Sequence, residues 1–485
     1  GLVMVFNSLT YLLLLSLVVF AFWQISQKAR YILIFFSSLV FYGFWRVDFI
    51  PLLLFSTFLD WWLSKKIYKC NNTTTKKRLL IFSLIINLGL LFVFKYLIFF
   101  TENTLGILNL MGGNFDLITL KIILPLGISF YTFQTISYTN DVYRKIIKPE
   151  NNFIIYGCYV TFFPQLIAGP ILRAKEVINQ FKKENKFNLD FIIVGLRRVL
   201  YGLFLKVVIA DNIAPLVDSG FDMPIDTLSA IDVWTLAFLF GFQIYFDFSA
   251  YSHIAIGSAR MIGIIFPENF NFPYLSISPR DFWRRWHISL SSWVRDYLYS
   301  PLMGQKFKEV SVGGLSEATI NKKDYKPLFI TWGLMGLWHG ANWTFIIWGV
   351  YHAILIYIYR SLSFLGKNFD LKFKVLIGWF FTISFVMLSW IPFRSQSLHD
   401  CFQMWLKIIN PLEYGYLGLR ENIYLVTFLL FIGILINFFL KEKIIIKKIF
   451  PKIVVWLSDL MLIVILFCLT FVFLRPINQF IYFQF

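Results

Sequence analysis

Two histidines in apolar surroundings are the side chains best suited to proton transfer. His339 lies in the stretch from Pro327 to Tyr359, which carries no formally charged side chain. Because desolvation keeps a buried imidazole neutral and able to accept a proton, His339 is a candidate general base. Asn342 is a candidate for fixing the tautomer of that ring, and Trp338 is a second supporting candidate. The alternative is a structural histidine hydrogen-bonded to a neighbouring helix.

The second histidine, His287, follows the start of an expected helix. Ser278 is a potential N-cap, Pro279 suits the first helical position, and Asp281 lies three residues after the cap. From this start we expect one amphipathic helix to about residue 298, with an aromatic apolar face at the membrane interface. His287 falls near the edge of that face, where it is either a second catalytic group or a core histidine that makes a hydrogen bond.

The polar face of the same segment carries three arginines, Arg284, Arg285 and Arg295. They either contact lipid headgroups or bind the phosphates of an anionic substrate, because guanidinium groups suit both tasks. Asp296 is a further supporting candidate beside them.

The other reactive side chains give weaker signals. His253, His352 and His399 are interpreted as structural, and His352 is expected to face away from His339 if one continuous helix joins them. The four cysteines are scattered without a Cys-x-x-Cys pair, so we expect free thiols and no metal site. The sequence also lacks a phosphate-binding loop, an H-E-x-x-H motif and a G-x-S-x-G elbow, which argues against those mechanisms.

The elements that position these residues are expected to be membrane helices. Of the 485 residues, 58% are hydrophobic and 15% are charged, whereas a soluble chain carries about 25% charged residues. The apolar runs are far longer than the strands of a membrane barrel, so the predicted fold class is all-α and polytopic. The expected spans are residues 5–26, 31–48, 50–63, 79–100, 119–140, 152–170, 190–210, 231–263, 327–359, 372–392, 422–440 and 453–474.

The distribution of charge orients these spans. Lysine and arginine exceed aspartate and glutamate by 45 − 27 = 18, and such an excess usually marks cytoplasmic loops. With the N-terminus outside, the basic cluster after the third span lies in the cytoplasm, and the basic insert at about 304–326 reads as a cytoplasmic loop. Pro164 and Gly169 predict a broken or re-entrant helix at 152–170. The stretch 327–359 is too long for one span, so we expect a bend near its glycines.

The start of the chain gives two expectations. Residues 1–3, before Met4, are interpreted as a vector-derived remnant. The apolar run that follows lacks the basic start and the small-residue cleavage site of a signal peptide, so we expect a retained first span. Neither an internal repeat nor paired interrupted helices of the secondary-transporter kind is evident, and one membrane domain is the simplest organisation.

Two long motifs surround the candidate histidines. The segments PRDFWRRWHISLSSWVRDYLYSPL at 279–302 and WGLMGLWHGANWTFIIWGVYHA at 332–353 resemble the membrane-bound O-acyltransferase superfamily. The sequence is most similar to the bacterial branch, which includes membrane subunits for O-acetylation of alginate and peptidoglycan and for D-alanylation of teichoic acid. Stretches at 124–144, 162–170 and 246–274 support the resemblance, which is strong over about 120–360.

The resemblance implies a fold and a site. The fold is a ring of about eleven membrane helices, with re-entrant and interfacial helices, around a central tunnel. N-terminal helices would occupy residues 1–118, the catalytic core 119–360 and C-terminal helices 361–485. His339 corresponds to the catalytic histidine of the superfamily and His287 to its second conserved polar position. No bound cofactor or metal is expected.

Together these features predict an acyltransferase of the bacterial cytoplasmic membrane. Acetyl-CoA is the expected donor, with its phosphates near the arginines, and a cell-wall or extracellular polysaccharide, with peptidoglycan favoured, is the expected acceptor. An extracytoplasmic esterase-like partner is expected to complete the transfer, and no nucleic acid is involved. The alternatives are acetylation of an alginate-like exopolysaccharide, D-alanyl transfer to teichoic acid and, in a different class, transport of a polysaccharide or lipid-linked substrate.

Overall fold

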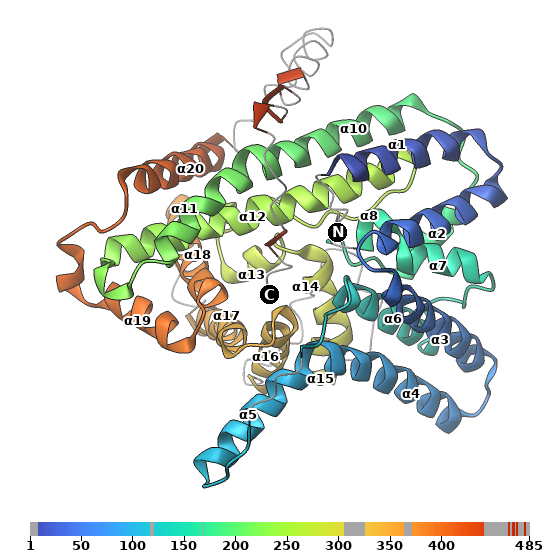
Figure 1. Ribbon diagram of the computed structural model, residues 1–485, viewed down its shortest axis with the longest axis horizontal. Helices are drawn as coiled ribbons and strands as arrows, with labels where there is room; N and C mark the ends of the chain where they lie inside the picture. The colour runs from blue at the N-terminus through green and yellow to red at the C-terminus, as the bar shows by residue number, and fades with distance from the viewer. Residues whose placement is uncertain are drawn as a thin grey trace. The chain divides into compact units, whose positions relative to one another are not determined.

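The computed structural model of the chain describes residues 8–116, 121–166, 168–304, 325–362, 371–440, 464–465, 468–470, 472–473 and 480–481 (Figure 1). These residues form helices joined by turns and short 3₁₀ and π segments, with no β-strand among them. Six helices in this part of the chain are long and apolar enough to cross a membrane. The protein is therefore an all-helical, multi-pass membrane protein, as expected from its composition, and the count of about eleven spans stays a prediction.

Contacts within the chain define two compact units. The first combines Gly1–Val199 with Tyr251–Glu268, and the second combines Leu200–Ala250 with Asn269–Phe485. Two helices, α10 (Leu189–Phe204) and α12 (Ala230–Met261), contribute residues to both units.

The first unit holds the N-terminal helices. They are α1 (Leu9–Gln24), α2 (Gln27–Gly43), η1 (Val47–Phe49), α3 (Ile50–Lys69), α4 (Thr73–Leu91), the π segment η2 (Phe92–Tyr96), α5 (Leu97–Leu110), α6 (Ile128–Tyr143), α7 (Phe153–Thr161), α8 (Phe163–Leu166) and α9 (Ala174–Lys182). The interruption between α7 and α8 at Phe162 confirms the broken helix expected at 152–170.

A buried carboxylate joins three of these helices, which run side by side in Figure 1. Asp60 of α3 is completely buried. Its Oδ1 accepts hydrogen bonds from the hydroxyls of Ser83 on α4 and Thr139 on α6, at 2.5 and 2.8 Å. Its Oδ2 accepts from the amide of Asn87, also on α4, at 2.7 Å. These three donors compensate the cost of removing the carboxylate from water and hold α3, α4 and α6 together.

The second unit holds the remaining described elements. They are η3 (Leu205–Ala210), α11 (Asp211–Phe221), η4 (Ile225–Thr227), η5 (Pro273–Leu275), α13 (Pro279–Trp283), α14 (Ile288–Val294), the π segment η6 (Arg295–Tyr299), α15 (Ser300–Leu302), α16 (Lys326–His339), α17 (Trp343–Leu362), α18 (Leu371–Arg394), α19 (Leu398–Ile409), η9 (Pro411–Tyr414) and α20 (Glu421–Leu440). Helices α18 and α20 confirm the apolar runs expected at 372–392 and 422–440. The expected span 453–474 and most of the expected basic insert lie outside the described residues.

Helices α16 and α17 form a tight antiparallel hairpin (Figure 1). A Cβ atom placed on Gly336 would lie 2.2 Å from the carbonyl oxygen of Phe345, and one on Gly349 would lie 2.1 Å from that of Trp332. The two backbones are therefore in direct contact, as small residues permit at helix interfaces in membranes. The chain reverses between His339 and Trp343, which confirms the bend expected in the stretch 327–359.

The expectation of one amphipathic helix from 279 to 298 is wrong. Helix α13 ends at Trp283, a turn follows, and α14 begins only at Ile288. The aromatic side chains Trp286 and Trp293 are 1% and 7% exposed, so protein covers them and they do not form a lipid-facing surface. The aromatic periodicity therefore predicted correctly that these residues are buried, but the expectation that lipid covers them was wrong.

The contact between the α16 and α17 backbones predicts that Gly349→Ala is destabilising. The added methyl group would force the hairpin apart, and overpacking of this kind costs about 1–3 kcal/mol. The thermal unfolding midpoint of the purified protein is therefore expected to fall. Gly333→Ala on α16 is the matched control, because a Cβ atom there meets nothing within 4 Å. Equal midpoints for the two variants would contradict the close packing.

Candidate active site

His339 is the last residue of α16, and the backbone of its own helix holds its ring. Side chains of a helix lean towards its N-terminus, and Nδ1 lies 2.7 Å from the carbonyl oxygen of Met335, one turn earlier. Since a carbonyl oxygen can only accept, Nδ1 carries the proton and donates it, and Nε2 presents a lone pair. His339 is buried. The ring therefore has the tautomer that a general base needs, with Nε2 unprotonated.

Aromatic side chains from three helices surround this imidazole. The centroid of the His339 ring lies 5.0 Å from that of Trp338 on α16, 4.7 Å from Trp348 on α17 and 5.6 Å from Phe393 on α18. All three aromatic side chains are buried. Such walls exclude water, which protects reactive intermediates from hydrolysis.

His287 lies in the sharp turn between α13 and α14. Its backbone is left-handed, with φ 43° and ψ 55°, a conformation that residues other than glycine adopt rarely and at an energetic cost. Backbone hydrogen bonds fix the chain on both sides. Asn271 donates to the carbonyl of Arg285, and Ile288 donates to the carbonyl of Asn269, each at 2.9 Å. The segment before α13 thus holds His287 in an otherwise unfavourable conformation.

The structure brings His287, Trp338 and His339 together. The ring centroid of Trp338 lies 6.1 Å from His287 and 5.0 Å from His339. His287 is completely buried. Burial lowers the pKa of His287 well below its ordinary value of 6.5, and the neighbouring His339 lowers it further. His287 is therefore neutral at physiological pH, with one nitrogen that donates and one that accepts.

The three candidate arginines have different surroundings. Arg285 pairs with Asp281, with 2.9 Å between Nε and Oδ1. Arg295 pairs with the buried carboxylate of Asp296 at 2.6 Å. Of the three, only Arg284 has an exposed side chain. Arg285 and Arg295 thus make local ion pairs, whereas Arg284 is accessible to a ligand.

The sequence suggested that Asn342 fixes the tautomer of His339, but in the structure its side chain has another partner. Its side-chain oxygen accepts a hydrogen bond from the backbone N–H of Thr344 at 3.1 Å, in the first turn of α17. The carbonyl of Met335 supplies the partner of His339 instead.

The other histidines lie in three different places. The reversal of the chain brings His352 back towards His339, because both rings contact Trp348, at 5.0 and 4.7 Å. The expectation that His352 faces away depended on a continuous helix, which the structure does not have. His253 accepts a hydrogen bond from Arg198, and His399 is exposed.

A buried charge cluster in the same unit was missed from the sequence. The ammonium group of Lys206 lies 2.8 Å from Asp211 and 2.7 Å from Asp247. The second oxygen of Asp247 accepts from the backbone N–H of Ile481 at 2.7 Å. The position of Lys206 and Asp247 in apolar stretches could have revealed them, because ionisable residues inside a membrane are functional candidates by default.

This cluster is connected to His287 by aromatic packing. Phe248, next to Asp247, packs edge-on against His287 with 4.6 Å between ring centroids. Phe480, completely buried, packs against the same Phe248 at 5.7 Å. The charge cluster therefore fixes α12 and residues 480–481, which pack around His287 through Phe248.

A backbone-fixed base beside a neutral imidazole suits proton transfer coupled to group transfer. Within the described residues, no group of three or more His, Cys, Asp or Glu side chains is placed to hold a metal ion. Residues 147–393, which include both histidines, match the family described as MBOAT, membrane-bound O-acyltransferase family. The chain belongs to this family, and it is an acyltransferase.

Similar proteins modify bacterial polymers. A peptidoglycan O-acetyltransferase of Helicobacter pylori is 38% identical over 395 residues, which cover 76% of this chain and 71% of the relative. A probable alginate O-acetylase AlgI of Azotobacter vinelandii is 39% identical over 411 residues, covering 84% of this chain and 78% of the relative. A teichoic acid D-alanyltransferase of Bacillus subtilis is 28% identical over 283 residues, which cover 56% of this chain and 69% of the relative.

The lowered pKa of His287 predicts a contribution to acid instability. Between the lowered folded pKa and the ordinary value of 6.5 the unfolded chain binds the extra proton, so stability falls as the pH drops below 6.5. The contribution is at most about 1.4 kcal/mol per pH unit. His287→Asn tolerates the left-handed backbone and does not titrate, so its unfolding midpoint is expected to fall less between neutral and mildly acidic pH. An unchanged pH dependence of the midpoint in His287→Asn would contradict this contribution.

Loss of the buried cation at Lys206 is expected to be strongly destabilising. Lys206→Met leaves two buried carboxylates without their cation, and breaking a buried pair costs about 3–5 kcal/mol. The control is Arg46→Met, which removes an exposed ion pair with Asp48 and is expected to change little. Thermal unfolding of both purified variants provides the comparison, and an unchanged midpoint for Lys206→Met would contradict the assigned role.

Proposed function

We propose that this protein takes acetyl groups from cytoplasmic acetyl-CoA and passes them across a bacterial cytoplasmic membrane for O-acetylation of a polysaccharide. The observation that carries the proposal is the unprotonated Nε2 of His339, set among aromatic walls close to the neutral His287. Acyl transfer from a thioester to a hydroxyl needs such a base. The names of the relatives at 38% and 39% identity support acetyl as the transferred group.

The orientation of the second unit follows from charge. Helix α18 starts in a basic part of the sequence that includes Arg360 and Lys374, and Lys441 and Lys443 follow α20. These ends lie in the cytoplasm under the positive-inside rule. The connection from residue 395 to 420 then lies on the extracytoplasmic side.

The transfer step uses both histidines. The Nε2 of His339 takes the proton of an acceptor hydroxyl as its oxygen attacks the carbonyl carbon of the thioester. A new C–O bond forms, the C–S bond breaks, and the thiolate leaves with its electron pair. The thiolate then takes the proton from the imidazolium, which returns His339 to its neutral form. His287 donates a hydrogen bond that orients the acceptor or polarises the carbonyl.

The donor and acceptor approach from opposite sides of the membrane. Arg284 has an exposed side chain next to the turn that carries His287, and in this proposal its guanidinium group binds a phosphate of CoA. On the other side a separate extracytoplasmic protein of the esterase type completes transfer to the polysaccharide. Peptidoglycan is the favoured acceptor, and an alginate-like exopolymer is the alternative.

The test of this function is His339→Ala in the full-length protein. The substitution removes the base and is expected to reduce transfer of labelled acetyl from acetyl-CoA by at least about a thousandfold, while the protein stays folded in membranes. His352→Asn, which alters the neighbouring ring contacts, is the comparison and is expected to retain transfer per folded molecule. Undiminished acetylation by His339→Ala would refute the assignment.

The same assay separates the alternative functions. A transporter moves its substrate without consuming acetyl-CoA, so labelled CoA thioester would stay intact. A D-alanyl transferase with a protein-bound donor is insensitive to free CoA as a competitor. Consumption of acetyl-CoA that depends on His339 is the result expected here.

A further inference from the structure

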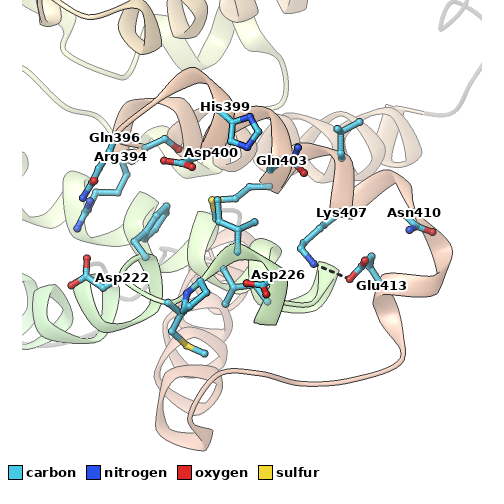
Figure 2. Close-up of a pocket in the computed structure, with 18 residues that line it drawn as sticks. Asp222, Asp226, Arg394, Gln396, His399, Asp400, Gln403, Lys407, Asn410 and Glu413 are labelled. Atoms are coloured by element: carbon cyan, nitrogen blue, oxygen red, sulfur yellow. Dashed lines mark hydrogen bonds and ion pairs between the residues drawn. The ribbon is translucent and has the colours of Figure 1, made fainter.

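A polar cavity of about 810 Å³ lies in the second unit, apart from His287 and His339 (Figure 2). Helix α19 forms one wall, and the connection between α11 and α12 forms the other. None of its lining residues belongs to the enclosure of His287 and His339. Its volume is within the range of about 300–1,000 Å³ typical of small-molecule sites.

The cavity lining has an excess of negative charge. Its two cationic side chains are already paired, Arg394 with Asp218 and Lys407 with Glu413. Three other lining carboxylates, Asp222, Asp226 and Asp400, have no cationic partner in the part of the chain that the structure describes. Counting Glu413, the four lining carboxylates and two lining cations leave −4 + 2 = −2. The field in the cavity therefore attracts cations and repels anions.

The remaining lining suits a sugar ring. Gln396 and Gln403 each offer an amide that both donates and accepts, which matches neighbouring hydroxyl groups. Leu406, whose side chain is 57% exposed, supplies apolar surface for the C–H face of a ring. A basic protein segment would bind through the negative charge alone. It would not need amide groups next to apolar surface, whereas a sugar ring uses both.

The position of the cavity fits the acceptor side of the reaction. It is lined by residues just beyond the end of α18 and by the connection that follows α11. In the orientation proposed above, the end of α18 is extracytoplasmic. A ligand on this side meets the cavity without crossing the lipid.

We propose that this cavity binds a sugar unit of the acceptor polysaccharide, and that it selects units without negative charge, either neutral or amine-bearing. This inference rests on the proposed function and names the class of its acceptor. Polyuronate or polyphosphate backbones are disfavoured, because their charge meets three unpaired carboxylates.

Direct binding tests the proposal. The full-length protein in lipid nanodiscs is titrated with three tetrasaccharides of equal length, composed of N-acetylglucosamine, glucosamine or galacturonic acid. The neutral and amine-bearing tetramers are expected to bind at least about tenfold more tightly than the uronate. Added salt is expected to weaken the discrimination against the uronate, because it screens exposed charges.

Variants locate the binding. Gln403→Ala is expected to weaken binding of the neutral tetramer about tenfold by removing an amide that pairs with sugar hydroxyls. The double change Asp222→Asn with Asp226→Asn keeps the shape and is expected to reduce the discrimination against the uronate. Glu421→Gln is the matched control, because Glu421 is exposed at the start of α20 and does not line the cavity.

Several outcomes would overturn the proposal. One is uronate binding as tight as that of the neutral tetramer, and another is an equal effect of Gln403→Ala and Glu421→Gln. A third is loss of association with the extracytoplasmic partner in the cavity variants without any saccharide binding, which would make the cavity a protein docking site. His339→Ala is expected to keep saccharide binding. Binding without acetyl transfer by the parent protein would therefore reject the proposed function and retain the saccharide site.

Discussion

The direct contact between the backbones of α16 and α17 is the constraint on which the candidate active site depends. Gly336 lies against the carbonyl of Phe345, and Gly349 lies against that of Trp332. Helices this close can be consecutive only if the chain reverses at once, and it does so between His339 and Trp343. The reversal places His339 at a helix end and sets Trp348 of the returning helix against its ring.

Lipid makes every buried polar group expensive, and the two units meet this cost in different ways. Asp60 is compensated by neutral hydroxyl and amide donors, whereas Lys206 is compensated by two carboxylates. The candidate active site contains imidazole rings, and a neutral ring costs less to bury than an ion. The site can therefore hold its reactive groups in a water-poor enclosure without a network of counter-ions.

Composition and apolar run length were sufficient to predict an all-helical membrane protein, because lipid leaves the backbone few other ways to satisfy its hydrogen bonds. They failed between residues 279 and 298, where aromatic spacing shows that a residue is buried but not whether lipid or protein buries it. The left-handed backbone at this turn is adopted by His287 and not by a glycine, so the sequence carries no glycine from which the turn could be predicted. The partner of His339 is the backbone carbonyl of Met335, and a backbone group has no signature in the sequence, which is why Asn342 was chosen instead.

Both histidines lie where a helix is interrupted, and this position explains how a buried ring can still react. Side chains lean back along a helix, so the ring of His339 reaches Met335 while no later turn of α16 covers its other side. A carbonyl partner does not titrate and cannot rotate away, so the tautomer of the base is independent of pH and of neighbouring side chains. The base is then defined by the path of the chain alone. Donor and acceptor surfaces can differ between family members without altering it, which agrees with relatives whose names give different acyl groups and different polymers.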